Sequence, residues 1–173
     1  MKKRCLLLFL FCLFCGGILF AHYPKREMRG AWIATVANID WPAKEVFDAL
    51  EQQRQLLAIL DTLMNNKINM IVFQVRPTAD AFYQSSLEPW SHWLTGVQGT
   101  APQPFYDPLA FVIEEAHARC MDVHVWLNPY RVTNQMDTAI LTKKHLFHKH
   151  RDWFVEYGDK WYFNPGLDRK SVV

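Results

Sequence analysis

The spacing of apolar and polar residues divides the chain into short apolar runs and longer segments with helical periodicity. The short runs predict three strands, over residues 28–36, 69–76 and 122–128. The longer segments predict three helices, over residues 44–65, 107–119 and 137–150. A hairpin is predicted over residues 154–163. Because strands that alternate with helices of ten or more residues form parallel βαβ units, the predicted fold class is α/β.

Two of the predicted helix ends carry local signals. Asp107 followed by Pro108 is an N-cap residue with proline at the first helical position. Asn65 and Asn66 are predicted to supply the left-handed residue that ends the first helix, a role that glycine often has.

Two of the predicted strands become polar on one face towards their C-terminal ends. One face of the second strand carries Met70, Val72, Gln74 and Arg76, and one face of the third carries His124, Trp126 and Asn128. This asymmetry favours a parallel (β/α)₈ barrel whose inward face opens into a site. An open doubly wound sheet also binds ligands at strand ends, but no glycine-rich phosphate loop follows any of the three strands.

A long connection follows the second strand. About thirty residues, 77–107, separate this strand from the next helix signal, whereas a structural βα connection has about two to six residues. The segment is rich in aromatic residues and carboxylates. We therefore expect it to form part of the mouth of an active site.

The N-terminal 21 residues have the organisation of a signal peptide. Basic residues at positions 2–4 precede an apolar run over residues 5–20, and cleavage is expected between Ala21 and His22. An uncleaved membrane anchor and lipoprotein attachment at Cys12 or Cys15 are the alternatives. Each reading predicts an exported protein that is periplasmic, exposed at the cell surface or extracellular.

Charge and cysteine content exclude several classes of protein. The chain has 19 Lys and Arg against 17 Asp and Glu, and the predicted signal peptide holds three of the basic residues and none of the acidic ones. The remainder therefore carries a net charge of −1, which gives no basis for binding nucleic acid or an anionic membrane surface. Of the four cysteines, only Cys120 lies beyond the predicted signal peptide, so an internal disulfide is not expected there. Cys120 is expected to pack at a helix end, and a catalytic thiol is the alternative.

Several ordered motifs over residues 26–166 resemble the glycosyl hydrolase-like 10 family of secreted bacterial proteins. The matching segments are MRGAWIATV with NIDWP, FQVRP with DAFY, EPWS with LTG, YDPL with EEAH, and WLNPYR. The resemblance implies a (β/α)₈ barrel related to glycoside hydrolases. It also implies a similarity to enzymes that cut peptidoglycan glycan strands lacking stem peptides.

The chain departs from the family pattern in three places. Lys67-Ile68 stands where the family commonly has glycine or another small residue, and Arg119-Cys120 stands where it usually has Arg-Gly. The family's acidic motif, which resembles Asp-Gly-(Ile/Val)-His-(Phe/Leu)-Asp-Asp-Tyr, has no match here. Residues 168–173 also leave the pattern, and we hypothesise that they are translated sequencing adapter. Because a full barrel needs about 250 residues, we expect an inactive, poorly soluble N-terminal fragment with about three βα units.

Glycoside hydrolysis needs two carboxyl groups, one on each side of the scissile bond. The catalytic candidates are Asp40 and Asp80, which both lie just beyond strand ends, and Glu88 is a further acidic residue of the long loop. For Asp40 and Asp80, the alternative is a structural role or the binding of substrate hydroxyl groups. Glu88 in particular is expected to anchor the loop or to pair with Arg76.

Polar and aromatic residues near the strand ends suit sugar hydroxyls and sugar ring faces. The predicted substrate-binding residues are Trp41, Gln74, Arg76, Trp90, Trp93, Asn128, Tyr130 and Arg131. Arg76 and Arg131 have the alternative role of neutralising buried carboxylates of the half-barrel that this sequence is expected to lack. Trp32, His124 and Trp126 are expected in the core.

The segment that contains His145, His148 and His150 is predicted to be a solvated basic helix face, because four Lys or Arg residues lie around the histidines. No metal and no cofactor are expected. The sequence therefore predicts a glycoside hydrolase that acts on a cell-envelope or extracellular glycan, with a polysaccharide as its partner. A non-catalytic glycan-binding barrel is the alternative. Contact with a membrane is expected only through an uncleaved signal segment.

Overall fold

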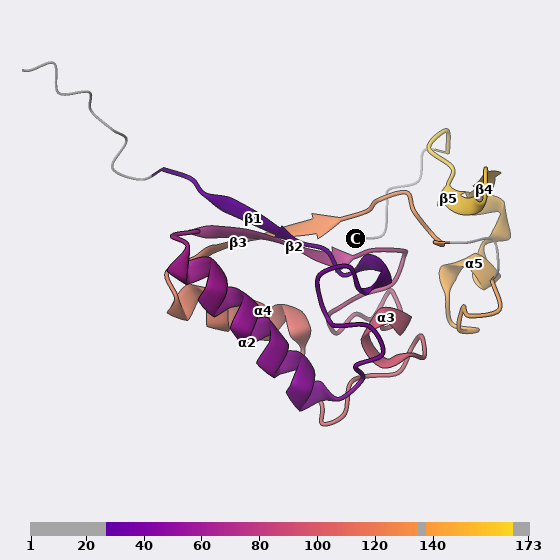
Figure 1. Ribbon diagram of the computed structural model, residues 1–173. Helices are drawn as coiled ribbons and strands as arrows, with labels where there is room; N and C mark the ends of the chain where they lie inside the picture. Colours follow the sequence, from indigo (N-terminus) through magenta and orange to yellow (C-terminus); the bar gives the residue numbers. More distant parts are fainter. Residues whose placement is uncertain (1–26, 135–137, 168–173) are drawn as a thin grey trace, which may run out of the picture.

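A computed structural model describes residues 27–134 and 138–167 (Figure 1). The predicted signal peptide and the atypical tail over residues 168–173 lie outside the described residues. Three parallel strands form one sheet in the order β1-β2-β3, with β1 at Gly30–Ile33, β2 at Met70–Arg76 and β3 at Asp122–Leu127. The predicted α/β class and the three parallel strands are therefore confirmed, whereas the closed barrel stays a prediction.

The first strand is shorter than predicted. After Ile33 the chain turns into the short 3-10 helix η1, Val36–Asn38, in which Ala37 and Asn38 adopt positive φ angles. The carboxylate of Asp40 closes this turn by accepting the Ala34 N–H at 2.7 Å. The end of β1 is therefore fixed by a local turn, which the apolar pattern does not signal.

Two helices connect the three strands, α2 at Ala49–Asn65 and α4 at Pro108–Ala118. Helix α4 begins as predicted, because the Asp107 side chain accepts the N–H groups of Leu109 and Ala110. Helix α2 begins five residues later than predicted. The Asp48 side chain is its N-cap and accepts the Glu51 N–H at 2.8 Å, which sets the start of the helix at Ala49.

The residues that end these two helices correct the predicted cap. Asn66 has a φ of −88°, and the left-handed conformation falls on Lys67, at φ 63°. The corresponding residue after α4 is Cys120, at φ 57°, and it is exposed rather than packed as predicted. Both positions are those at which the sequence departs from the small residues of the resembled family.

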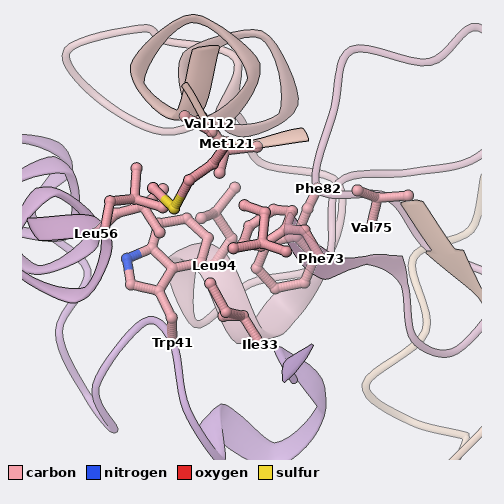
Figure 2. Close-up of a cluster of buried hydrophobic side chains, with 12 residues drawn as sticks. Ile33, Trp41, Leu56, Phe73, Val75, Phe82, Leu94, Val112 and Met121 are labelled. Carbon is pink, nitrogen blue, oxygen red and sulfur yellow. The ribbon is translucent and has the colours of Figure 1, made fainter. Parts of the chain in front are cut away.

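Both helices lie on the same side of the sheet (Figure 1). Alternate residues of β2, namely Ile71, Phe73 and Val75, point towards them and are at most 1% exposed. Figure 2 shows the resulting core, in which β2 packs against side chains of both helices, the long loop and the segment after β1. The core therefore positions the C-terminal ends of the strands relative to the long loop.

The opposite face of the sheet is not covered by a helix within the described residues. Trp32 is 65% exposed there and contacts Trp126 edge-to-face, with 5.2 Å between ring centroids. His124 is also exposed. The prediction that Trp32 and His124 are core residues is wrong for this structure, because it assumed a closed barrel around them.

The C-terminal part forms a second hydrophobic cluster. The predicted helix over residues 137–150 is wrong, because the described part of this segment contains only the short helix α5, Leu146–Lys149. Turns precede α5, and the Thr142 N–H connects them to the long loop by donating to the Gln98 side chain. The 3-10 helix η2, Arg151–Trp153, leads into the predicted hairpin, which is confirmed as β4, Phe154–Tyr157, and β5, Lys160–Phe163.

Within residues 27–134 and 138–167, no helix is long and apolar enough to cross a membrane.

Candidate active site at the strand ends

The long loop folds back over the C-terminal end of β2. Its first residues are buried, and the Phe82 N–H donates to the Val75 carbonyl at 2.9 Å. Ala81 and Trp90 form a parallel bridge, and the short helix α3, His92–Thr95, follows. The loop is therefore a packed structure fixed to the strand ends.

The central interaction of this region is a buried ion pair between Arg76 and Glu88. The guanidinium of Arg76 donates from Nε and Nη2 to the Glu88 carboxylate, with Nε to Oε2 at 2.7 Å. Both side chains are 2% exposed. The expectation that Glu88 anchors the loop by pairing with Arg76 is confirmed.

The same arginine joins the ends of β2 and β3. Its Nη1 donates to the Asn128 carbonyl at 2.5 Å, and the Asn128 N–H donates to the Arg76 carbonyl at 2.9 Å. The Asn128 side chain donates to the Pro77 carbonyl and accepts from the Trp126 indole. The amide nitrogen and the amide oxygen of the Asn128 side chain are therefore both hydrogen-bonded to protein groups.

Gln74 joins β2 to the end of β1. Its Oε1 accepts the N–H groups of Thr35 and Val36, both at 2.9 Å, and Nε2 has no hydrogen-bond partner within the described part of the chain. Gln74, Arg76, Glu88 and Asn128 are called the strand-end cluster below. The structure therefore brings the three residues predicted at the strand ends to one edge of the sheet, as expected for parallel strands.

The two catalytic candidates differ in accessibility. Asp40 is exposed, although one of its oxygens closes the turn after β1. Asp80 is fully buried, and its Oδ1 accepts from the backbone and hydroxyl of Thr78. Its Oδ2 lies 3.9 Å from Nδ1 of His92, and neither atom has a hydrogen-bond partner among the described residues. Catalysis by either aspartate stays a prediction, and in this structure Asp80 faces His92 rather than solvent.

A second buried histidine contributes to the electrostatics near Asp80. The ring of His145 is fully buried, and its Nδ1 accepts the Phe147 N–H at the start of α5. Burial lowers the pKa of His145 to about 4, because loss of hydration outweighs the favourable effects of Asp80 and the Ala79 carbonyl on the protonated ring. His145 is therefore neutral at pH 7, which corrects its predicted place on a solvated basic face.

The predicted aromatic residues have different environments. Trp41 has no exposed surface, and its indole donates to the Gln52 carbonyl within the core, so it cannot stack on a sugar in this structure. Trp41 was predicted to bind substrate because it lies in a loop, and the loop sequence does not reveal that tertiary contacts bury this side chain. Trp90 and Trp93 are partly exposed, and Tyr130 is 54% exposed. These three retain faces that a ligand can reach.

Arg131 is also partly exposed, and its backbone pairs with Tyr162 of β5 in an antiparallel bridge. The hairpin thereby approaches the strand-end cluster, and the Phe163 ring centroid lies 5.7 Å from the guanidinium carbon of Arg76. Sequence reasoning missed His92, His145 and Phe163 near the site. Only Phe163 carried a usable signal, because it lies in a predicted hairpin that follows a polar strand end.

Within the described residues, no three or more His, Cys, Asp or Glu side chains are grouped so that they could hold a metal ion. The polar groups at the strand ends instead form hydrogen bonds and one ion pair. Such an arrangement can orient hydroxyl or amide groups of a ligand.

Comparison with known proteins adds an independent finding. The sequence pattern that defines the glycosyl hydrolase-like 10 family matches residues 27–170. The chain is 48% identical over 143 residues to glycosyl hydrolase YngK of Bacillus subtilis, covering 82% of this chain and 28% of that protein. It is 36% identical over 159 residues to glycosyl hydrolase DigH of Escherichia coli, covering 83% of this chain and 36% of that protein. The chain thus spans about a third of the length of these relatives.

Proposed function

Because the chain belongs to the glycosyl hydrolase-like 10 family, we propose that it is part of an exported glycoside hydrolase that acts on cell-envelope glycan of the peptidoglycan type. The observation that carries this proposal is the strand-end cluster, in which residues of β2, β3 and the long loop converge at one edge of a parallel sheet. In α/β barrel enzymes this edge holds the active site.

The proposed role of this chain is to bind and orient the glycan. The accessible groups are the exposed carboxylate of Asp40, the ring of Tyr130 and the partly exposed Trp90 and Trp93. Arg76 is proposed to act indirectly, by holding the strand ends and the long loop together, since its guanidinium is occupied by Glu88 and Asn128. We place the second carboxyl group that hydrolysis requires on the part of the family's barrel that this chain does not match.

One observation favours a second candidate, a glycan-binding barrel without catalytic activity. Of the three acidic residues predicted near the site, Asp80 and Glu88 are buried and bonded to protein groups. Only Asp40 among these three is exposed. With one accessible carboxylate, these residues lack the carboxyl pair that most glycoside hydrolases use, which favours binding without cleavage.

The test uses glycan strands freed of their stem peptides, incubated with this chain and with the longest reading frame that contains it. The proposal predicts release of reducing ends by the longer protein and loss of that activity in its Asp40→Asn variant. Asp122→Asn is the matched control, because Asp122 is exposed at the opposite end of β3. Binding of the strands without reducing-end release would support the non-catalytic candidate, and neither binding nor release would reject both.

A further inference from the structure

The hairpin β4–β5 has two aromatic faces, of which only one is buried. Its register pairs Phe154 with Phe163 and Val155 with Tyr162. Directly opposed residues of an antiparallel pair share a face, and neighbouring pairs alternate between faces. Phe154 and Phe163 pack in the second hydrophobic cluster, whereas Tyr157, on the same face as Val155 and Tyr162, is 79% exposed. The hairpin therefore presents an aromatic surface that its own packing does not use.

This surface forms one wall of a pocket of about 270 Å³, close to the lower end of the size range of small-molecule sites. The lining, called the hairpin pocket below, consists of Tyr130, Val155, Tyr157, Tyr162, Phe163 and Pro165. A space of this size holds a single ring rather than the surface of a folded protein.

The hairpin pocket lies beside the strand-end cluster. The Phe163 N–H donates to the Tyr130 carbonyl at 2.8 Å, which places β5 beside the segment that leaves β3. Phe163 lines the pocket and also lies over the guanidinium of Arg76. A ligand chain bound at the strand ends therefore meets this pocket next.

The chemistry of the lining selects the type of ligand. Among residues 27–134 and 138–167, no charged side chain lines the pocket, so a charged group that entered it would lose hydration without gaining a partner from these residues. The lining presents apolar surface to the pocket, and tyrosine rings supply faces for stacking. A pyranose ring has C–H groups on its faces, which can stack on such a surface while its hydroxyl groups stay in contact with solvent.

We propose that the hairpin pocket is an accessory subsite that holds a neutral pyranose ring of a glycan chain whose neighbouring rings lie at the strand-end cluster. This inference rests on the proposed function and adds a position for one further sugar ring. Stacking on Tyr157 and Tyr162 supplies the contact, and Tyr130 connects the subsite to the end of β3.

The experiment measures the affinity of the purified chain for N-acetylglucosamine tetramer and dimer by titration calorimetry. We expect the tetramer to bind more tightly, and Tyr157→Ala to weaken tetramer binding by about five- to tenfold with little effect on the dimer. Tyr157→Phe keeps the ring and should stay within about twofold of the wild type. Phe47→Ala is the matched control, since Phe47 is an exposed aromatic residue outside the pocket.

Tyr162→Ala should weaken tetramer binding like Tyr157→Ala, and thermal melts will show whether each variant is folded. If Tyr162→Ala unfolds the hairpin, Tyr157→Ala still decides, because its side chain is largely in solvent. Unchanged tetramer affinity in Tyr157→Ala would overturn the subsite while leaving the proposed function intact. Self-association that disappears in this variant would instead assign the pocket to a second copy. Absence of binding by the wild type would overturn the subsite, and absence of reducing-end release would separately reject the hydrolase.

Discussion

The guanidinium of Arg76 and the carboxylate of Glu88 form an ion pair that is almost completely enclosed, with both side chains 2% exposed. The pair joins the end of β2 to the long loop, and the Nη1 group of Arg76 extends the connection to Asn128 after β3. The connection between β2, the long loop and the end of β3 therefore depends on a buried electrostatic interaction.

Removing one partner of this pair should strongly destabilise the chain. Glu88→Gln leaves a buried guanidinium without a counter-charge, and the expected loss in the free energy of unfolding is about 3–5 kcal/mol. Urea denaturation followed by circular dichroism measures it. A matched exposed pair is Arg54 and Glu51, so Glu51→Gln should leave the denaturation midpoint nearly unchanged. Equal effects of the two substitutions would show that Arg76 and Glu88 are not enclosed together.

Glycine should stabilise the chain at two helix ends. Lys67 and Cys120 adopt φ angles of 63° and 57°, a conformation that costs a residue with a Cβ about 1 kcal/mol more than glycine. Lys67→Gly and Cys120→Gly should each raise the free energy of unfolding by about 0.5–1 kcal/mol. Asn66→Gly is the control, because its φ of −88° gives glycine no advantage. Destabilisation by both substitutions would contradict the left-handed geometry.

The buried His145 predicts a pH dependence of stability. Its pKa is lowered to about 4 in the folded chain, below the value of about 6.5 in an unfolded chain. Between these values the unfolded state binds more protons, so the stabilisation present above about pH 6.5 is lost progressively as the pH falls towards 4. The loss attributable to this residue is on the order of 3 kcal/mol.

His145→Asn isolates this contribution, since asparagine can still accept the Phe147 N–H that caps α5. The variant should show a smaller decrease in the free energy of unfolding between pH 7 and pH 4 than the wild type. Urea midpoints at several pH values measure the difference. Parallel pH profiles for the two proteins would mean that His145 titrates normally and is not buried.

Gln74 should be essential for the connection between β1 and β2. Gln74→Met keeps the volume of the side chain but leaves the buried N–H groups of Thr35 and Val36 without an acceptor. The expected loss is about 2–4 kcal/mol, from the cost of unpaired buried donors. Gln55→Met, which removes an acceptor for the exposed Ala43 N–H, should cost less than about 1 kcal/mol. Similar losses would show that Gln74 does not hold the strand ends.

Local sequence patterns predicted the elements whose causes are local. The apolar run before Gln74 forms β2, Asp107 begins α4, and the residues around Tyr157-Gly158 form the hairpin. Patterns failed where distant contacts decide. The segment before α5 reads as a helix, but the Thr142 backbone bonds to Gln98, more than forty residues earlier in the chain.

The candidate site was predictable to the same extent. Parallel strands place their C-terminal residues at one edge, so Gln74, Arg76 and Asn128 were expected together. Which polar groups remain accessible depends on folding of the long loop, and it buries Asp80 beside His92. Burial of Trp41 likewise depends on packing between segments that are far apart in sequence. The local pattern of the sequence does not show which side chains such distant contacts bury.

Hydrogen–deuterium exchange of the chain, with and without saturating N-acetylglucosamine tetramer, tests most directly whether the strand ends form a glycan site. Glycan binding at the strand ends predicts slower exchange in the segments that follow the three strands, over residues 34–41, 77–93 and 128–131, with no change in α2 and α4. Protection confined to the helices, or no protection anywhere at saturation, would contradict it.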